Sequence, residues 1–153
     1  MDKTDYRILE QLQRDGRLSS QALAERVGLS TTPCWRRVRK LERDGVIGRY
    51  VALLDPQSLG LEVTALANVS LEDHHPDSVG EFDRLVRECP EILECYATSG
   101  QYDYMLKLIC ASIVEYERVL TEQLLRCKAV HTVNTSFVLR STKDTTALPL
   151  PAA

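Results

Sequence analysis

The stretch that most constrains how this chain folds is residues 20–47, in which two glycines divide a helical pattern. Apolar residues recur at helical spacing up to Gly28, where the access of glycine to the left-handed region predicts the end of a first helix. A second helical pattern begins near Pro33, which suits a first helical turn because no amide hydrogen is needed there, and it ends at Gly45. Residues 46–50 then begin an extended segment. A helix, a tight turn, a second helix and a strand form the layout of a winged helix-turn-helix.

The second helix of this pattern is strongly basic. Its polar faces carry Arg36, Arg37, Arg39, Lys40 and Arg43. A charged helix face is often only solvated surface, but the nearby acids, Glu42 and Asp44, are few and lie near the C-terminal end. Polar residues 30–32 occupy the N-terminal end, from which such helices direct their base-reading side chains. We therefore expect this helix to enter the major groove of double-stranded DNA.

The charge of the chain is divided unevenly between its two parts. Residues 1–50 contain 11 Lys and Arg against 7 Asp and Glu, a net charge of +4, whereas the rest of the chain contains 8 against 15, a net charge of −7. Phosphates attract the first part and repel the second. This asymmetry indicates a DNA-binding domain that is attached to a domain with another task.

Beyond Gly60 the pattern changes to strands that alternate with helices. The expected elements are a strand over 62–71, a helix over 77–89, strands over 92–99 and 102–111, a helix over 114–126 and a strand over 130–140. This βαββαβ order predicts an α+β chain, in which a ferredoxin-like domain follows the winged helix-turn-helix. The expected boundaries are a DNA-binding domain at 1–48, a linking strand and hinge at 49–60, the second domain at 61–140, and a tail at 141–153 that is an arm or disordered.

A sheet with helices on one face leaves its other face bare. Alternating Val, Leu and Ile on four strands would make that face a large apolar patch, and a second copy of the chain is its simplest cover. Pairing by two-fold symmetry would also double the DNA site that one helix-turn-helix reads. We therefore expect a homodimer.

The remaining composition argues against several other classes of protein. The five cysteines, which form no Cys-x-x-Cys pair and lie in or beside apolar stretches, are expected to be buried free thiols: Cys34, Cys89, Cys95, Cys110 and Cys127. The three histidines do not have metal-ligand spacing, so no metal and no cofactor is expected. No apolar run is long enough for a membrane span, and the first residues lack the apolar core of a signal peptide. We expect a cytoplasmic protein without a membrane partner.

Several separate motifs together resemble one family. Residues 29–42 (LSTTPCWRRVRKLE) with 45–47 (GVI), the linking segment 50–56 (YVALLDP) with 59–60 (LG), and the turn 100–104 (GQYDY) resemble the leucine-responsive, Lrp/AsnC or feast/famine, transcriptional regulators. The match covers nearly the whole chain. It implies dimers joined through ferredoxin-like domains, often assembled into octamers, with amino acids as effectors that bind between dimers and alter assembly and DNA binding.

The basic helix supplies the candidate DNA contacts. The candidates for base reading or groove lining are Thr31, Thr32, Trp35, Arg36 and Arg39, because arginine can bind two acceptors of guanine and a threonine methyl can touch thymine. Lys40, Arg43 and Arg49 better suit phosphates. Two alternatives stay open: Trp35 can instead be buried against the first helix, and Arg37 can be structural, paired with an acid such as Glu42 or with a helix end.

The turn after the second expected strand supplies the candidate effector site. Its residues are Gly100, Gln101, Tyr102, Asp103 and Tyr104, to which the family resemblance adds Thr135 and Ser136 on the last strand by position alone. Gly100 allows a ligand to approach the backbone closely, and Asp103 can accept hydrogen bonds from the ammonium group of a ligand. Exposed main-chain amides of the turn can bind its carboxylate. The alternative is a hairpin turn in which Asp103 only caps its own backbone.

Two other functions are alternatives to a regulator: an enzyme and a stand-alone binding module. Some haem-biosynthesis decarboxylases resemble this family in both domains, but an enzyme would need proton donors or haem-facing histidines in a cleft, and its helix would have no reason to stay basic. A stand-alone amino-acid-binding module would lack residues 1–50. A transcriptional regulator, not an enzyme, is favoured.

Overall fold

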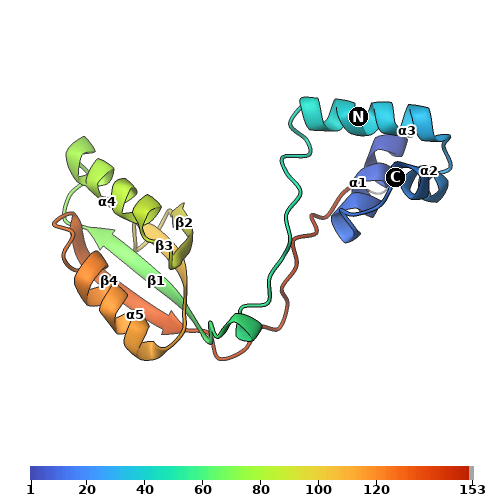
Figure 1. Cartoon of the computed structure of the whole chain (residues 1–153). Coiled ribbons are helices and arrows are strands. Elements are labelled where there is room, and N and C mark those ends of the chain that lie inside the picture. Colours follow the sequence, from blue (N-terminus) through green and yellow to red (C-terminus); the bar gives the residue numbers. More distant parts are fainter. Residues whose placement is uncertain (152–153) are drawn as a thin grey trace. The chain divides into compact units, whose positions relative to one another are not determined.

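The computed structural model describes residues 1–151, and the chain forms two compact units (Figure 1). The first unit contains Met1–Leu53 and the C-terminal residues from Lys143 onward, and the second contains Leu54–Thr142. Of the two expectations for the tail, an arm or disorder, the arm agrees with the grouping of its residues from Lys143 with the first unit. We describe each unit by itself.

Three helices form the first unit: α1 (Lys3–Arg14), α2 (Ser20–Val27) and α3 (Thr31–Arg43). Asp2 and Asp5 cap α1 reciprocally, each side chain accepting the backbone amide of the other residue at 2.9 Å. Gly28 ends α2 at φ +70°, as the sequence predicted. The three helices bury a small core of six residues, Ile8, Leu23, Ala24, Val27, Cys34 and Leu41.

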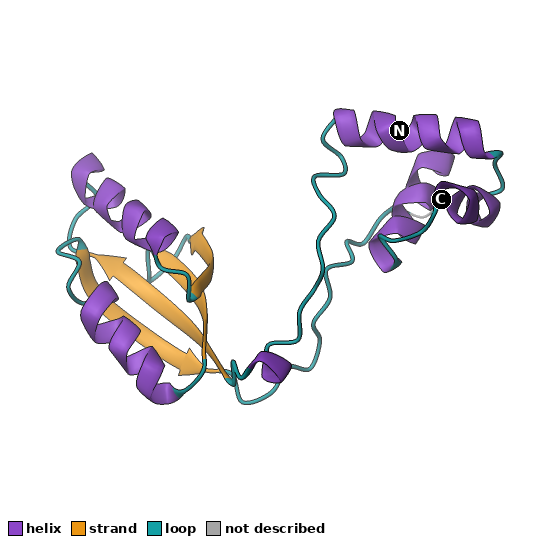
Figure 2. Ribbon diagram, in the orientation of Figure 1, coloured by secondary structure: helices purple, strands orange, loops and turns teal. Residues whose placement is uncertain are grey.

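The strand expected after α3 is absent from the described residues, and this part of the prediction is wrong. Residues 48–55 have no regular secondary structure (Figure 2), and none of their main-chain groups bonds to another main-chain group of the described chain. Val51, Leu53 and Leu54 are exposed. The segment has strand-forming residues, but a strand needs a neighbouring strand, and the helical first unit contains none.

The second unit is a four-stranded antiparallel sheet with helices on one face (Figure 2). Its elements are β1 (Val63–Leu71), α4 (Pro76–Glu88), β2 (Ile92–Ala97), β3 (Tyr104–Cys110), α5 (Ile113–Val119), η2 (Leu120–Leu124) and β4 (Val130–Phe137), after a short 3-10 helix, η1 (Gln57–Leu59). The strand order β2-β3-β1-β4 is that of a ferredoxin-like fold. The predicted α+β fold class is therefore confirmed.

The last helix differs from the single helix expected over 114–126. After Val119 the chain widens into a π-helical turn, in which the Leu125 amide donates to the Leu120 carbonyl at 2.8 Å. The Thr121 hydroxyl donates to the Glu117 carbonyl at 2.8 Å and so competes with the α-helical ladder. The side-chain hydroxyl gives a local reason for the change of helix type.

The two faces of the sheet differ in polarity. The apolar alternation, which includes Ala65, Ala67, Val69, Leu106 and Leu108, faces α4 and α5 and forms the core of the second unit. The opposite face, here called the open face, carries Thr64, Leu66, Asn68 and Ser70 of β1, Glu94 and Tyr96 of β2, Met105, Lys107 and Ile109 of β3, and Thr132, Asn134 and Ser136 of β4. The expected large apolar patch is therefore wrong, because the alternating residues belong to the covered face. The open face is mixed and includes an ion pair of 3.1 Å between Lys107 Nζ and Glu94 Oε1.

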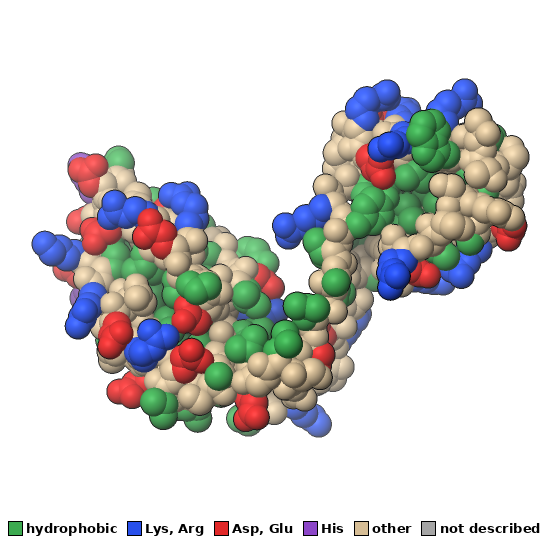
Figure 3. Space-filling model, viewed as in Figure 1, with side chains coloured by type: hydrophobic (Ala, Val, Ile, Leu, Met, Phe, Trp, Pro, Cys, Tyr) green, Lys and Arg blue, Asp and Glu red, His purple; other side chains and the backbone are tan. Residues whose placement is uncertain are grey.

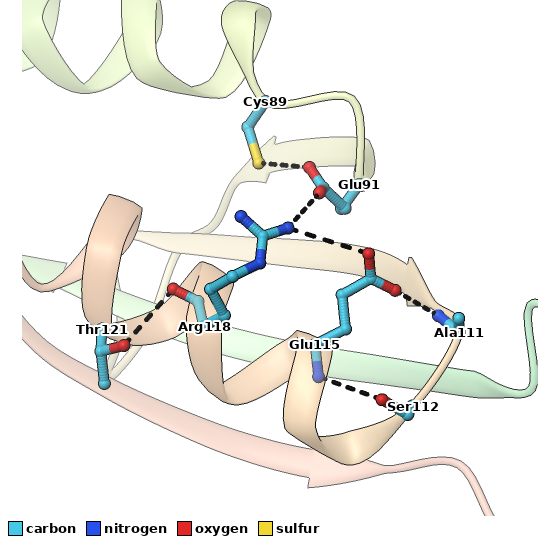
Figure 4. A network of polar contacts seen from close by, with 7 residues as sticks. All are labelled: Cys89, Glu91, Ala111, Ser112, Glu115, Arg118 and Thr121. Carbon is cyan, nitrogen blue, oxygen red and sulfur yellow. Dashed lines mark hydrogen bonds and ion pairs between the residues drawn. The ribbon is translucent and has the colours of Figure 1, made fainter.

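A polar network joins α5 to the start of β2 (Figure 4). Arg118 lies 3.4 Å from Glu91 and 3.8 Å from Glu115, and Glu115 accepts the Ala111 amide at 2.7 Å. The Cys89 thiol donates to Glu91 at 3.2 Å, and burial raises its pKa to about 11. A thiol with this pKa stays protonated and packs as an apolar group. All five cysteines are free, and Cys95 is half-buried where the other four are buried.

None of the helices between residues 1 and 151 is both long and apolar enough to cross a bilayer.

Candidate DNA-binding helix and effector turn

The helix α3 presents a basic surface to solvent. Arg36, Arg39, Lys40 and Arg43 are exposed, and Lys and Arg side chains gather along this helix at the upper right of Figure 3. Within residues 1–151, Arg36 and Lys40 have no acidic group at ion-pair distance, whereas Arg39 lies 3.3 Å from Glu42 and Arg43 lies 3.4 Å from Asp44. On α3, the least compensated positive charge therefore lies on Arg36 and Lys40, one turn of helix apart.

Arg37 differs from its neighbours because its guanidinium points back to α1. Its Nη1 lies 2.7 Å from Asp2 Oδ2 and 2.7 Å from Asp5 Oδ1. The backbone amide of Asp5 and the Arg37 guanidinium both hold the pKa of Asp2 below its usual range. Arg37 thus joins α3 to the capping box of α1. Its partners are these two aspartates and not Glu42, which the sequence suggested.

Trp35 lies on the surface of α3 and outside the buried core of its unit. Its side chain is 50% exposed, and the Arg39 guanidinium carbon lies 5.5 Å from the ring centroid. A cation at this distance is attracted to the face of the indole. Glu42, which pairs with Arg39, also accepts the Tyr50 hydroxyl at 3.2 Å, so these four residues form one surface cluster.

The N-terminus of α3 is open. Its N-cap residue, Ser30, makes no side-chain capping bond, and Thr31 and Thr32 are exposed. Uncapped amides at a helix N-terminus are available to a phosphate or a base edge. Arg49 is exposed in the segment that follows the helix.

In the second unit, the turn 98–103 connects β2 to β3. Gly100 has φ +143°, a conformation that side-chain-bearing residues rarely adopt, and Gln101 is exposed. The Thr98 amide donates to the Asp103 carbonyl at 2.8 Å, and the Thr98 hydroxyl donates to the Tyr102 carbonyl at 2.8 Å. These bonds close the base of the turn and leave residues 99–101 projecting.

Asp103 ties the turn to the end of β1. Its Oδ2 accepts the Leu71 amide at 2.8 Å, its Oδ1 lies 2.8 Å from His74 Nε2, and its own amide donates to the Val69 carbonyl at 3.0 Å. The bond from Leu71, and then the contact with His74, lower the pKa of the Asp103 carboxyl. The sequence allowed either a ligand contact or a local cap for Asp103, but the carboxylate bonds to a strand and a loop about 30 positions away. The contact with His74 was not predicted, because no local sequence pattern connects the two residues.

The other proposed effector residues point in different directions. Thr135 lies on the covered face, where its hydroxyl bonds to the Tyr116 hydroxyl, whereas Ser136 lies on the open face. Successive strand residues alternate between faces, so these two side chains cannot line one site in a single chain. Tyr104 packs on Phe82, with ring centroids 4.7 Å apart, and is part of the core packing.

Comparisons with known proteins agree with this geometry. Residues 1–47 match the family model described as winged helix-turn-helix DNA-binding, and residues 64–148 match that of the Lrp/AsnC ligand binding domain. The chain is 42% identical to the glutamate uptake regulatory protein of Zymomonas mobilis over 151 residues, which cover 99% of this chain and 92% of that protein. It is 40% identical to the leucine-responsive regulatory protein of Escherichia coli over 148 residues, covering 97% and 90%.

A solved structure shares the fold along nearly the full length. A transcriptional regulator of Neisseria meningitidis, crystallised in complex with L-methionine, superposes with a TM-score of 0.95 at 40% identity, covering 97% of this chain and 96% of that one. The relatives are regulatory proteins by name, and this chain matches both a helix-turn-helix model and a ligand-binding-domain model. The chain therefore belongs to the Lrp/AsnC family of DNA-binding transcriptional regulators and is not an enzyme.

Proposed function

We propose that this regulator reads its operator with α3 and that Arg36 contributes most to sequence recognition. The uncompensated charges of Arg36 and Lys40 carry this proposal. Arg36 follows the open N-terminus of the helix and can bind two acceptors of a guanine. Lys40, Arg43 and Arg49 bind phosphates and supply affinity without sequence information. Thr31, Thr32, Trp35 and Arg39 line the groove, and Arg37 positions α3 through its aspartate pair.

We propose an amino acid as the effector, bound at the projecting residues of the turn 98–103. The L-methionine bound to the related Neisseria regulator supports this chemistry. The main-chain amides of residues 99–101 suit the carboxylate of the ligand. Because the Asp103 carboxylate is already bonded to Leu71 and His74, we assign it to positioning the turn, and Gln101 and Tyr102 are the nearest side chains for contact with the ligand. Thr135 influences the effector site only through its bond to Tyr116. Ser136 can contribute to that site only from the open face.

We further propose that two copies pair across the open faces of their sheets, and that such dimers assemble into octamers. Leu66, Met105 and Ile109 supply apolar area on this face, and Lys107 with Glu94 supplies charges that a second copy can complement. The exposed and unpaired segment 48–55 offers a second surface for pairing. A DNA-binding regulator must reach the DNA, so we propose that the protein is cytoplasmic.

One experiment tests the effector part of the proposal. Genomic footprinting of the full chain with and without a panel of amino acids identifies the operators and the ligands that alter their occupancy. Sedimentation of the same samples reports assembly. We expect one or a few amino acids to change both, because a ligand can shift DNA binding only by favouring one of two states. A ligand that changes occupancy without any change in sedimentation would contradict the assembly mechanism.

A second experiment tests the dimer. The second unit alone, residues 54–142, is expected to sediment as a dimer at low micromolar concentration, and Leu66→Lys is expected to dissociate it. A charge at the centre of the open face is costly to bury, whereas Val114→Lys, at an exposed apolar residue of α5, is the matched control. A folded monomer of the parent fragment would move the dimer contact to segment 48–55 or to the first unit.

A further inference from the structure

The C-terminal tail lies along α1, and one side chain of the helix holds it. The Gln13 carboxamide donates through Nε2 to the Leu148 carbonyl at 3.1 Å and accepts the Leu148 amide through Oε1 at 3.0 Å. The two residues are 135 positions apart in the chain. Among the described residues, Gln13 is the only side chain outside the tail that hydrogen-bonds to the tail's main chain.

The chemistry of this contact is that of a strand pair. A glutamine carboxamide presents one donor side and one acceptor side, so it can match both main-chain groups of a single residue. Pro149 favours an extended backbone at Leu148, which turns the amide and the carbonyl of that residue toward Gln13. Pro149 and Pro151 have no amide hydrogen of their own, so the tail leaves few donors unsatisfied.

The tail and one face of α1 together form a groove. It is lined by Tyr6, Glu10, Gln13 and Arg14, which recur at the spacing of one helix face, and by Leu148 and Leu150 of the tail. Glu10 and Arg14 pair at 2.7 Å along its helical side. Leu150 and Tyr6 are half-buried there. The groove thus combines an apolar contact with a two-point main-chain clamp.

We propose that this face of α1 is a docking site for the C-terminal tail of the same chain, and that docking anchors the tail non-covalently, so that the chain connects the two units by a second segment. The chain leaves the first unit after Leu53 and returns to it at Lys143. With the tail docked, the first unit is held by two segments and samples fewer orientations than a unit on one linker. The tail follows β4 directly, so a change at that edge of the sheet reaches the DNA-binding unit without passing through residues 48–60.

Hydrogen exchange in the full chain tests the docking. In the parent, the Leu148 amide is expected to exchange at least about tenfold more slowly than in an unprotected chain. Gln13→Ala is expected to abolish this protection. Gln11→Ala, on the same helix but without a side-chain hydrogen bond among the described residues, should leave it intact. Protection that is missing in the parent, or that survives Gln13→Ala, overturns the docking.

A DNA measurement tests the tether, and this step rests on the proposed pairing of two DNA-binding units. Two DNA-binding units with restricted motion bind two half-sites together more readily than two free units do. Gln13→Ala is therefore expected to lower affinity for a footprinted operator several-fold, and to leave affinity for a DNA fragment with a single half-site unchanged. Equal affinity of parent and variant for the operator overturns the tether. The exchange result reports docking whether or not the protein pairs, so failure of the proposed function and failure of the docking are distinguishable.

Discussion

The two units of this regulator use their polar side chains in opposite ways. In the first unit, a core of six buried residues supports a helix on which two exposed basic side chains, Arg36 and Lys40, have no acidic partner among the described residues. In the second unit, a core of fifteen buried residues supports a turn whose carboxylate, Asp103, is bonded to its own scaffold. The proposed DNA site therefore consists of exposed side chains, whereas the proposed effector site consists mainly of main chain that side chains hold in place.

The largest effect should come from the cores. Phe82 and Ile8 are fully buried, one in each unit. Phe82→Ala should cost about 3–5 kcal/mol and Ile8→Ala about 2–5 kcal/mol of unfolding free energy. Each should loosen mainly its own unit, as measured by hydrogen exchange of peptides from both. If Phe82→Ala destabilises residues 3–43 as much as the sheet, the two units unfold together, which contradicts their separate stability.

Substitutions of two neighbouring arginines on α3 should affect different properties, DNA recognition for one and stability for the other. Arg36→Ala should cost about 1–3 kcal/mol in binding to the operator, much less on random DNA, and little in stability. Arg37→Ala removes a partner of the buried Asp5 and should cost about 1–3 kcal/mol in stability instead. DNA titrations at several salt concentrations and urea unfolding of both variants measure this. Lys40→Ala is the phosphate control and should weaken all DNA alike. Equal losses of Arg36→Ala on operator and random DNA would remove Arg36 from base reading.

Two substitutions of Asp103 should show whether its carboxylate positions the turn or contacts the ligand directly. Asp103→Ala loses the bonds to Leu71 and His74 and should abolish the response to amino acids. It should leave ligand-free DNA affinity within a few-fold of the parent, a change under about 1.4 kcal/mol. Asp103→Asn keeps an acceptor for the Leu71 amide and should retain part of the response, which ligand titration with sedimentation measures. If Asn is as inactive as Ala while the Leu71 amide remains protected from exchange, the carboxylate contacts the ligand itself.

The smallest effects should distinguish the two faces of β4. Tyr116→Phe removes the hydroxyl that bonds to Thr135 inside the unit and should cost about 0.5–1.5 kcal/mol in stability. Ser136→Ala, on the open face, should stay within about 0.5 kcal/mol. Urea unfolding of the two variants checks the order. A larger loss for Ser136→Ala would mean that assembly at the open face supports the fold.

Most of the fold was predictable because its signals are local. Helix spacing and Gly28 predicted the helix-turn-helix, and strand alternation predicted the ferredoxin-like order. What failed depends on contacts between distant positions. Segment 49–54 has the composition of a strand but no neighbour, and the alternation first assigned to a bare face belongs to the covered one. Alternation also places Thr135 and Ser136 on opposite faces, so this signal was present in the sequence.

The position of Trp35 allows the DNA-binding unit to be followed by intrinsic fluorescence, without an added label. It is the single tryptophan of the chain, and its half-exposed indole lies on α3 against a cationic side chain. Its emission reports the environment of the recognition helix alone, because the second unit contains tyrosines but no tryptophan. Titration with DNA should therefore change this fluorescence directly. Any change caused by an amino acid alone would be a signal that has crossed from one unit to the other.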